Sequence, residues 1–383
     1  MIFKRVIKSN EEQAIASWTN YINQVRLDNL LKNLQNQNQN FKDAINTLDS
    51  TMHQINKSII EQNRGGTKGM HGFIAEVAEC GIGNAREQIL GKAPKYIWIN
   101  DNGPFDFVRD GIEIQQKFVN SGNHLSLFAI KQHYEKYPWF LDGGRKYQIP
   151  ADHYEKIKML LSISENQANQ MGTKTGEFSL KQWKEVNQFF ATGNIKLSDI
   201  EPSKVSYKEV QRNQINTTIY NEKGNIKDID TNIRRDIYNK SKPTFKQGAY
   251  ISAIAASLEG GTAFITGIIK KKRLGKTISE FTKDDWLEIS RDSGIGAIKG
   301  GTRGITIYAL TNYTATPAAV ASSLCTASFG IAEEAYKFRK KLITKEEFLL
   351  NSQILCVDVS VSALSSILGH AVIPIPILGA VIG

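Results

Sequence analysis

A short segment in the first third of the chain carries residues whose types and spacing suit metal-dependent chemistry. Residues 103–118, GPFDFVRDGIEIQQKF, place polar side chains on alternate positions of a sequence that otherwise has strand composition. Side chains of a strand alternate between its two faces, so Glu113, Gln115 and Lys117 share one face. Asp106 ends the preceding strand and can approach Glu113 across the intervening turn. The segment therefore predicts two neighbouring carboxylates on a hairpin.

Two carboxylates at the edge of a strand are the hard oxygen ligands that Mg²⁺ or Mn²⁺ prefers. Such an ion polarises a phosphate group and lowers the pKa of a bound water molecule. A nearby Lys117 or Gln115 would position that water or neutralise developing charge. The alternative is an ordinary half-buried hairpin whose polar face lies in water, and the residues alone leave both interpretations open.

The pattern resembles the PD-(D/E)XK nuclease superfamily, whose core carries an aspartate and then Glu-x-Lys or Glu-x-Gln on the next strand. The matching residues are Asp106 in PFDF, and Glu113 and Gln115 in EIQ. Members often add an acidic residue from a preceding helix, and HGFIAEVAE supplies Glu76. The resemblance covers about residues 68–162, roughly a quarter of the chain.

The resemblance implies a restriction-endonuclease-like mixed sheet flanked by helices, with Mg²⁺ or Mn²⁺ as cofactor. It also implies hydrolysis of nucleic-acid phosphodiester bonds, with DNA favoured over RNA. The expected metal ligands are Glu76, Asp106 and Glu113, and the expected catalytic set adds Gln115 and Lys117. Two departures stand out. Phe105 separates Pro104 from the aspartate, and Gln115 occupies the position of the usual lysine, where Lys117 can restore the positive charge.

Charge and aromatic content suggest how a nucleic acid would be held. The formal net charge of +10 favours a polyanionic partner, either nucleic acid or an anionic membrane. Lys131 begins KQHYEKYPWF, which interleaves bases with aromatics and can stack on single strands, although an amphipathic helix anchored in the core has the same pattern. Arg145 and Lys146 are expected to contact phosphate. His124, near the site, can transfer protons or simply cap a surface turn.

The element that precedes this region is expected to be one long helix. Residues 1–63 carry an apolar stripe at 4,3 spacing from Leu27 to Ile59, in which Asn38 takes a heptad a position. A coiled coil that forms a homodimer or higher oligomer and an intramolecular helix packing explain the stripe equally well. We expect residues 64–165 to form the nuclease-like domain and residues 166–246 to be a polar, basic connecting region. The chain as a whole is predicted to be α+β or α/β.

The last part of the chain, residues 247–383, differs in composition. Residues 249–269, 304–332 and 354–383 are nearly free of charge and rich in small residues, and each run is long enough to cross a bilayer. Closely spaced glycines allow tight helix packing in a membrane or in a soluble bundle; they are Gly294, Gly296, Gly300, Gly301 and Gly304.

This region resembles in composition the glycine-zipper tails of bacterial toxins and phage-defence proteins. The resemblance implies a nuclease of the bacterial cytoplasm held at the inner membrane. The alternative function is a membrane-active, pore-forming effector. Cys80, Cys325 and Cys356 lie far apart, which argues against zinc binding and against a disulfide scaffold. The sequence contains no P-loop and no nucleophile elbow.

Overall fold

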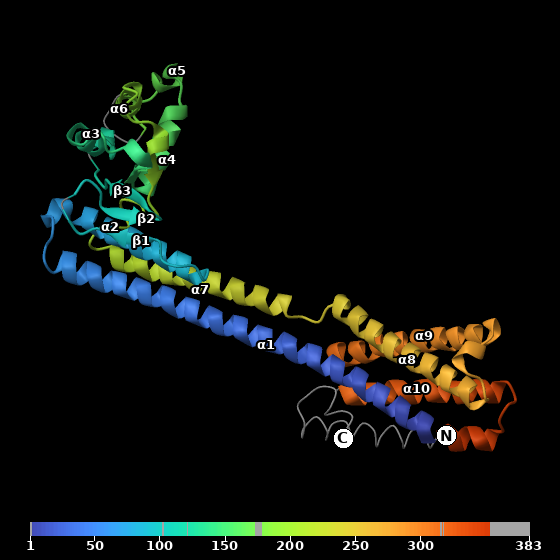
Figure 1. Ribbon diagram of the computed structural model, residues 1–383. Coiled ribbons are helices and arrows are strands. Elements are labelled where there is room, and N and C mark those ends of the chain that lie inside the picture. The colour runs from blue at the N-terminus through green and yellow to red at the C-terminus, as the bar shows by residue number, and fades with distance from the viewer. Residues whose placement is uncertain are drawn as a thin grey trace. The chain divides into compact units, whose positions relative to one another are not determined.

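The computed structural model describes residues 2–101, 103–120, 122–172, 178–314, 316 and 318–352. The chain divides into two compact units (Figure 1): Lys32–Ile237 forms one, and Met1–Leu31 together with Tyr238–Gly383 forms the other. The described residues are mostly helical and contain one mixed five-stranded sheet, so the α+β class expected from the sequence is confirmed. Each unit is described separately below.

The sheet lies in the Lys32–Ile237 unit, and its strands are ordered as they occur in the chain. They are β1 (Tyr96–Trp98), β2 (Phe107–Arg109), β3 (Ile112–Gln116), β4 (Lys146–Ile149) and β5 (Ile200–Pro202). The pairs β1–β2 and β2–β3 are antiparallel, whereas β3–β4 and β4–β5 are parallel. The strands predicted within residues 103–118 are confirmed as β2 and β3.

A two-residue loop sets the register of the β2–β3 hairpin. Asp110 and Gly111 both have positive φ, 52° and 83°, the conformation of the tight turn that matches the twist of paired strands. Arg109 therefore lies opposite Ile112, and Val108 lies opposite Glu113. This register determines which polar side chains of the two strands meet.

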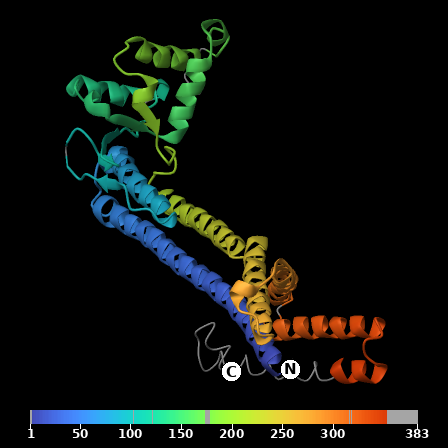
Figure 2. The ribbon, with the colours of Figure 1, turned by 45° about the vertical axis from the view of Figure 1, so that its right-hand side comes forward.

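Helices make the two parallel crossovers of the sheet (Figure 2). The β3–β4 connection carries α3 (Leu127–Lys136), and the β4–β5 connection carries α4 (Ala151–Ser162), α5 (Glu165–Ala168) and α6 (Leu180–Ala191). Their apolar faces share one core with the sheet, which includes the buried Phe140, Tyr147, Ile157 and Val186. Because β5 pairs with β4, the sheet extends beyond residue 165, where the sequence predicted that this domain would close.

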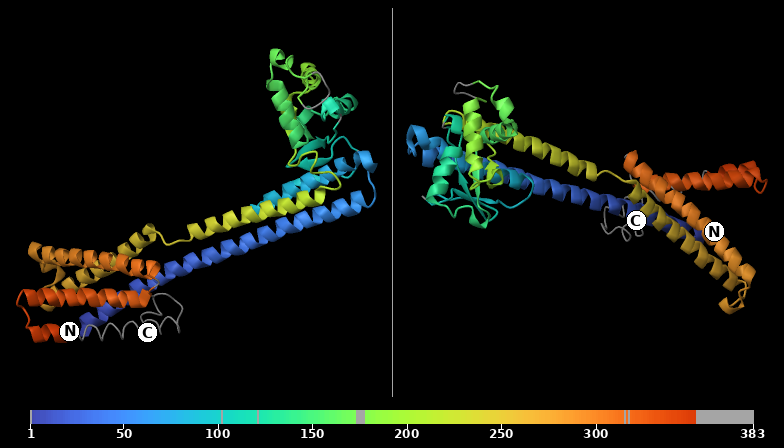
Figure 3. Two further views of the ribbon diagram at one scale, coloured as in Figure 1. Left: turned by 180° about the vertical axis from the view of Figure 1, so that it is seen from behind. Right: turned by 90° about the horizontal axis from the view of Figure 1, so that it is seen from above.

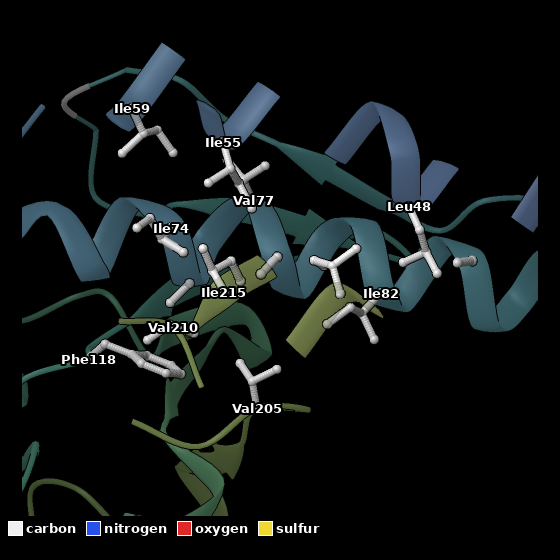
Figure 4. Close-up of a cluster of buried hydrophobic side chains, with 14 of the residues drawn as sticks. Leu48, Ile55, Ile59, Ile74, Val77, Ile82, Phe118, Val205, Val210 and Ile215 are labelled. Carbon is white, nitrogen blue, oxygen red and sulfur yellow. The ribbon is translucent and has the colours of Figure 1, made fainter. Parts of the chain in front are cut away.

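A second core joins α1 (Ile2–Ile55) and the π-helical turn Asn56–Ile60 to α2 (Gly66–Ile89) and α7 (Ile215–Lys240). Figure 4 shows Leu48, Ile55 and Ile59 packed against Val77 of α2 and its neighbours. The C-terminal half of the apolar stripe is thus buried within the chain, as the intramolecular interpretation expected.

The rest of the stripe behaves differently. Leu27 and Leu31 are 47% and 50% exposed, and Asn38 is exposed. The buried polar residue is its neighbour Gln37, which donates a hydrogen bond to Asp230 Oδ1 of α7 at 2.9 Å. Asn38 therefore does not occupy a buried seam in this structure. Oligomerisation through the stripe from Leu27 to Ile59 stays a prediction.

The other unit contains the antiparallel helices α8 (Phe245–Arg273) and α9 (Lys283–Tyr313), which lie side by side (Figure 3), and α10 (Ala318–Arg339). Glycines of α9 permit this approach: a Cβ on Gly300 would lie 2.2 Å from the backbone oxygen of Ala255. The close packing expected from the small residues is confirmed. The charge-free run 304–332 is shared between α9 and α10, and the run 354–383 lies outside the described residues.

Candidate active site

Asp106 lies just before β2, and the hairpin register directs its carboxylate to the end of β3. Its backbone N–H donates to Ile114 O at 2.9 Å. The backbone N–H of Gln116 donates to Asp106 Oδ2 at 2.7 Å, and the side-chain amide of Gln115 donates to the same oxygen. Both donors reach Oδ2, and within the described part of the chain no hydrogen bond reaches Oδ1. The Oδ1 atom is therefore the oxygen that a cation can take.

Glu76 is placed by α2, the helix that precedes the sheet. The indole Nε1 of Trp98, on β1, donates to Glu76 Oε2 at 3.1 Å and fixes the orientation of the carboxyl group. Burial, followed by repulsion from the charge of Asp106, raises the pKa of Glu76 to about 8. Burial also raises the pKa of Asp106 to about 6. The two carboxyl groups are thus close enough that the charge on Asp106 changes the pKa of Glu76.

Lys117 supplies the positive charge of this group. It follows β3 directly, and its backbone N–H donates to Gln148 O of β4 at 2.8 Å. Burial lowers the pKa of the Lys117 ammonium, while attraction to Asp106 and then to Glu76 opposes the change. The same lysine lowers the pKa of both carboxyl groups. Glu76, Asp106 and Lys117 therefore form one electrostatic cluster at the end of the hairpin.

The cluster fits a hard cation that keeps most of its water. Among the described residues, no group of three or more His, Cys, Asp or Glu side chains is arranged to hold a metal ion. Glu76 and Asp106 make a two-carboxylate set, which is the number that Mg²⁺ sites commonly take when substrate phosphates and water complete the shell. The side chain of Gln116 lies on the other face of β3 from Gln115 and donates to Gln148 Oε1 at 2.7 Å, so it is not counted among the ligands. The donor chemistry consequently favours Mg²⁺ or Mn²⁺ over a soft metal.

Glu113 does not meet Asp106, contrary to the expectation from the sequence. It lies opposite Val108, and its carboxylate accepts a hydrogen bond from Nε of Arg145 in an ion pair. Arg145 also donates to Asp142 O at 2.6 Å. The two-residue Asp110-Gly111 loop places Gln115, two positions further along β3, at the aspartate. Glu113 and Arg145 are thus partners of each other, and Arg145 is not a free phosphate ligand.

Two further basic residues were expected to bind nucleic acid. Lys131 is exposed on α3 with its ammonium 4.0 Å from Glu135. Lys146, on β4, donates to Ser198 O at 2.7 Å. The charges that shift the pKa of Glu76 and of Asp106 do not include either lysine. The structure therefore leaves both residues outside the electrostatic cluster, and their binding role stays a prediction.

Glu79 lies one turn after Glu76 and is fully buried, but its oxygens are occupied. Oε2 accepts from Ser203 Oγ at 2.7 Å and from Lys204 N at 2.8 Å, and Oε1 accepts from Lys204 Nζ at 3.0 Å and Gln148 Nε2 at 3.2 Å. These bonds tie α2 to β4 and to the segment that follows β5. Glu79 is accordingly an anchor of the fold.

The two histidines near the site also have partners. His71 Nε2 lies 2.7 Å from Phe118 O, and His124 Nδ1 lies 3.2 Å from a carboxylate oxygen of Glu185 on α6. These contacts suit structural roles for both rings, the alternative that the sequence left open for His124.

Arg64 is a candidate site residue that the sequence patterns did not indicate. Its guanidinium lies 4.0 Å from the ring centroid of Phe73 and 5.7 Å from that of Trp98, and it donates to Asn100 Oδ1. Its charge lowers the pKa of Glu76, so the guanidinium lies near the carboxylate. Arg64 begins the glycine-rich segment RGGTKGMHG, and nothing in the composition of this segment distinguishes the arginine from Lys68 as a site residue.

His133, on α3, is the second missed residue. Its Nδ1 lies 2.9 Å from Tyr147 Oη, and the ring also contacts the backbone of Pro104. Burial, and then the charge of Lys117, lowers the pKa of His133 to about 4. A neutral imidazole therefore lies beside the lysine. The pattern KQHYEKYPWF gave no sign of this position.

Comparisons with known proteins add no relative: no family model, no curated protein and no solved structure matches this chain.

Proposed function

We propose that this protein is a divalent-metal-dependent nuclease that hydrolyses phosphodiester bonds of nucleic acid, with DNA as the favoured substrate. The observation that carries the proposal is the pair of carboxyl groups, Glu76 and Asp106, whose pKa values are raised to about 8 and about 6 beside the half-buried Lys117. Carboxylates that repel each other and are partly withdrawn from water are poised to bind a cation. A structural salt bridge would instead pair each carboxylate with its own cation.

The topology supports a restriction-endonuclease-like core as part of this proposal. An antiparallel hairpin, β2–β3, continues into the parallel strands β4 and β5, and α2 supplies an acidic residue from one side. With this strand pairing, the proposed motif is Asp106 followed by Gln115-x-Lys117. It begins two residues later than Glu113-x-Gln115, which the sequence suggested. The revised motif recovers the usual lysine and puts glutamine in place of the acidic residue.

Each residue of the cluster then has a defined task. Glu76 and Asp106 Oδ1 would hold the cation, and a bound Mg²⁺ or Mn²⁺ would polarise the phosphate and acidify a water molecule. Gln115 and the Gln116 N–H hold Asp106 Oδ2, which fixes the direction of Oδ1. Lys117 donates hydrogen bonds to the attacking water or to the phosphate and neutralises developing charge. Arg64, whose charge acts on Glu76, would pair with a phosphate oxygen of the substrate.

The proposal is tested by cleavage of double-stranded DNA, single-stranded DNA and RNA by the purified full-length chain with Mg²⁺, Mn²⁺ or EDTA. We expect metal-dependent cleavage that Asp106→Asn, Glu76→Gln and Lys117→Met each reduce by at least about a hundredfold. Glu113→Gln is the matched control, because it removes a carboxylate of the same hairpin that pairs with Arg145, and it should retain most of the activity. Absence of cleavage of all three substrates with both metals would overturn the proposal.

A further inference from the structure

The end of the α8–α9 hairpin exposes an unusual amount of apolar surface. We define the hairpin tip as residues 264–288, the last turns of α8, the connection and the first turns of α9. Within it Leu274 is 70% exposed, Ile265 59% and Leu287 57%. Other large side chains of the tip are also exposed, namely Phe264, Ile269, Ile278 and Trp286. Grouped apolar side chains of this kind mark a surface that contacts a partner or a membrane.

The charge of the tip selects between these partners. Between Lys270 and Glu288 the sequence holds six basic and four acidic side chains, a net charge of plus two. Two of the acids are paired: Asp285 with Lys271 and Lys276 at 2.8 and 2.6 Å, and Glu288 with Lys270 and Lys271 at 3.1 and 2.6 Å. Lys272 and Arg273 are exposed, and no described carboxylate pairs with them. Positive charge beside apolar side chains is complementary to an anionic lipid surface.

The aromatic residues of the tip suit the same surface. Phe264 stacks with Trp286 at a centroid distance of 6.3 Å, and Phe281 lies 5.3 Å from Trp286. Tryptophan concentrates where hydrocarbon meets headgroups, because its ring is apolar and its N–H is polar. The tip therefore combines exposed apolar, basic and aromatic side chains, the three residue classes found at interfacial binding sites.

The hairpin is suited to lie in the interface rather than to cross the bilayer. By length and composition, one helical stretch of the described residues, Ile215–Arg273, can span a membrane. Between residues 247 and 269 its one charged residue is Glu259, which forms a buried ion pair of 2.5 Å with Arg303 of α9. Moving α8 alone into hydrocarbon would break this pair, which is costly. Moving both helices would bury Arg291, Asp292 and Lys299, which are exposed on α9.

We propose that the hairpin tip binds the surface of a bilayer that contains anionic phospholipids. Ile265, Leu274 and Leu287 enter the boundary between headgroups and acyl chains, and Lys272 and Arg273 contact the phosphate headgroups. The Glu259–Arg303 pair and the glycine packing keep α8 and α9 together while the tip is bound. This role is independent of the nuclease site and differs from a pore, because neither helix crosses the membrane.

The test is co-sedimentation of the full-length protein with phosphatidylcholine vesicles, with or without 30% phosphatidylglycerol, at low and high salt. We expect binding to the anionic vesicles that weakens as salt screens the basic side chains, and much weaker binding to pure phosphatidylcholine. Leu274→Asp with Ile278→Asp, and separately Lys272→Glu with Arg273→Glu, should each weaken binding by about tenfold or more. All four positions are exposed, so these variants should keep the thermal midpoint of the wild type.

Matched controls lie on the same hairpin outside the tip. Ile298→Asp removes an apolar side chain that is 73% exposed, and Lys299→Glu reverses an exposed charge; each should leave vesicle binding within about twofold of the wild type. The proposal is overturned if the wild type stays in the supernatant with anionic vesicles or binds both vesicle types equally. It is also overturned if the tip variants bind as the wild type does, which would place the contact elsewhere, or if they change only the mass of the particle in solution, which would indicate a second copy as the partner.

Discussion

Gln115 is the residue of β3 that meets Asp106: its side-chain amide donates to Oδ2 of the aspartate, while Glu113 pairs with Arg145. This contact decides which residues form the candidate site. It leaves two carboxyl groups, Glu76 and Asp106, as the proposed cation ligands, and Lys117 lies on the same face of the strand as Gln115.

Gln115→Glu should convert the pair into a set of three carboxylates. The substitution removes the amide hydrogen bond to Asp106, and the new carboxylate repels Asp106 and Glu76. Without metal we therefore expect a lower thermal midpoint at pH 8. With Mg²⁺ or Mn²⁺ the loss should be recovered, because a third oxygen ligand strengthens the site. Thermal unfolding with and without 5–10 mM metal, roughly the range that fills a weak site, measures both effects. Equal midpoints for this variant with and without metal would contradict the assignment.

The pH dependence of the free energy of unfolding should reveal the raised pKa of Glu76. Its pKa is about 8 when folded, against an ordinary value of 4.5, so between these values the folded state binds more protons than the unfolded state. The free energy of unfolding of the metal-free protein should therefore fall as pH rises from about 5 to 8. Glu76→Gln removes this term and should stabilise the protein by on the order of 1–2 kcal/mol at pH 8 but little at pH 5. Urea unfolding at both pH values measures the difference, and equal effects at the two would count against a shared site.

Metal binding should have the opposite dependence. Protons compete with the cation for Glu76 and Asp106, so affinity should increase from pH 6 to pH 8. Calorimetric titration with Mn²⁺ measures the affinity. The Glu113→Gln variant should follow the wild-type curve, because Arg145 rather than the cation is the partner of Glu113.

Arg64 should contribute to substrate binding more than to the chemical step. With Arg64→Gln we expect weaker DNA binding by about three- to tenfold, with a smaller dependence on salt concentration, since one phosphate contact is lost. Arg64→Lys should recover part of the affinity, because it keeps the charge but loses the planar guanidinium. Fluorescence anisotropy with labelled DNA in Ca²⁺ is the measurement, and Lys181→Gln, at an exposed position of α6, serves as the basic control. Unchanged affinity and salt dependence for Arg64→Gln would remove it from the site.

Glu79 should matter for the fold and not directly for catalysis. Glu79→Ala would leave Lys204 and Ser203 without their buried acceptor, so we expect a loss of about 3 kcal/mol in the free energy of unfolding. Glu79→Gln keeps part of the hydrogen bonding and should cost less. Urea unfolding ranks the two variants. A stable Glu79→Ala protein that lacked only metal binding would instead place Glu79 among the ligands.

The elements of the hairpin were predictable from the sequence, and the pairing was predictable too. Strand composition and the Asp-Gly turn located β2 and β3. Counting outward from a two-residue Asp110-Gly111 loop pairs Arg109 with Ile112 and brings Asp106 to Gln115. The expectation that Asp106 approaches Glu113 did not follow this register, which places Glu113 opposite Val108. A slip of this kind changes every cross-strand contact, which is why register matters more for the site than strand location.

Other features depend on contacts between distant segments. β5 is three residues long and forms by pairing with β4, so composition alone did not reveal it. The apolar stripe of α1 predicted a buried face but not whether α2 and α7 or a second chain would cover it. Gln37, within a polar run, is buried because Asp230 of α7 meets it. Arg64 lies at Glu76 because Phe73 and Trp98 hold its guanidinium, a contact that joins two separate segments.

The most direct test of the central claim compares DNA cleavage by Asp106→Asn and Glu113→Gln in the same Mg²⁺ or Mn²⁺ buffer, after circular dichroism has shown that both variants are folded. The proposed nuclease function predicts that Asp106→Asn abolishes cleavage and that Glu113→Gln cuts at a rate close to that of the wild type. Normal cleavage by Asp106→Asn, or loss of cleavage by Glu113→Gln alone, would contradict the site described here.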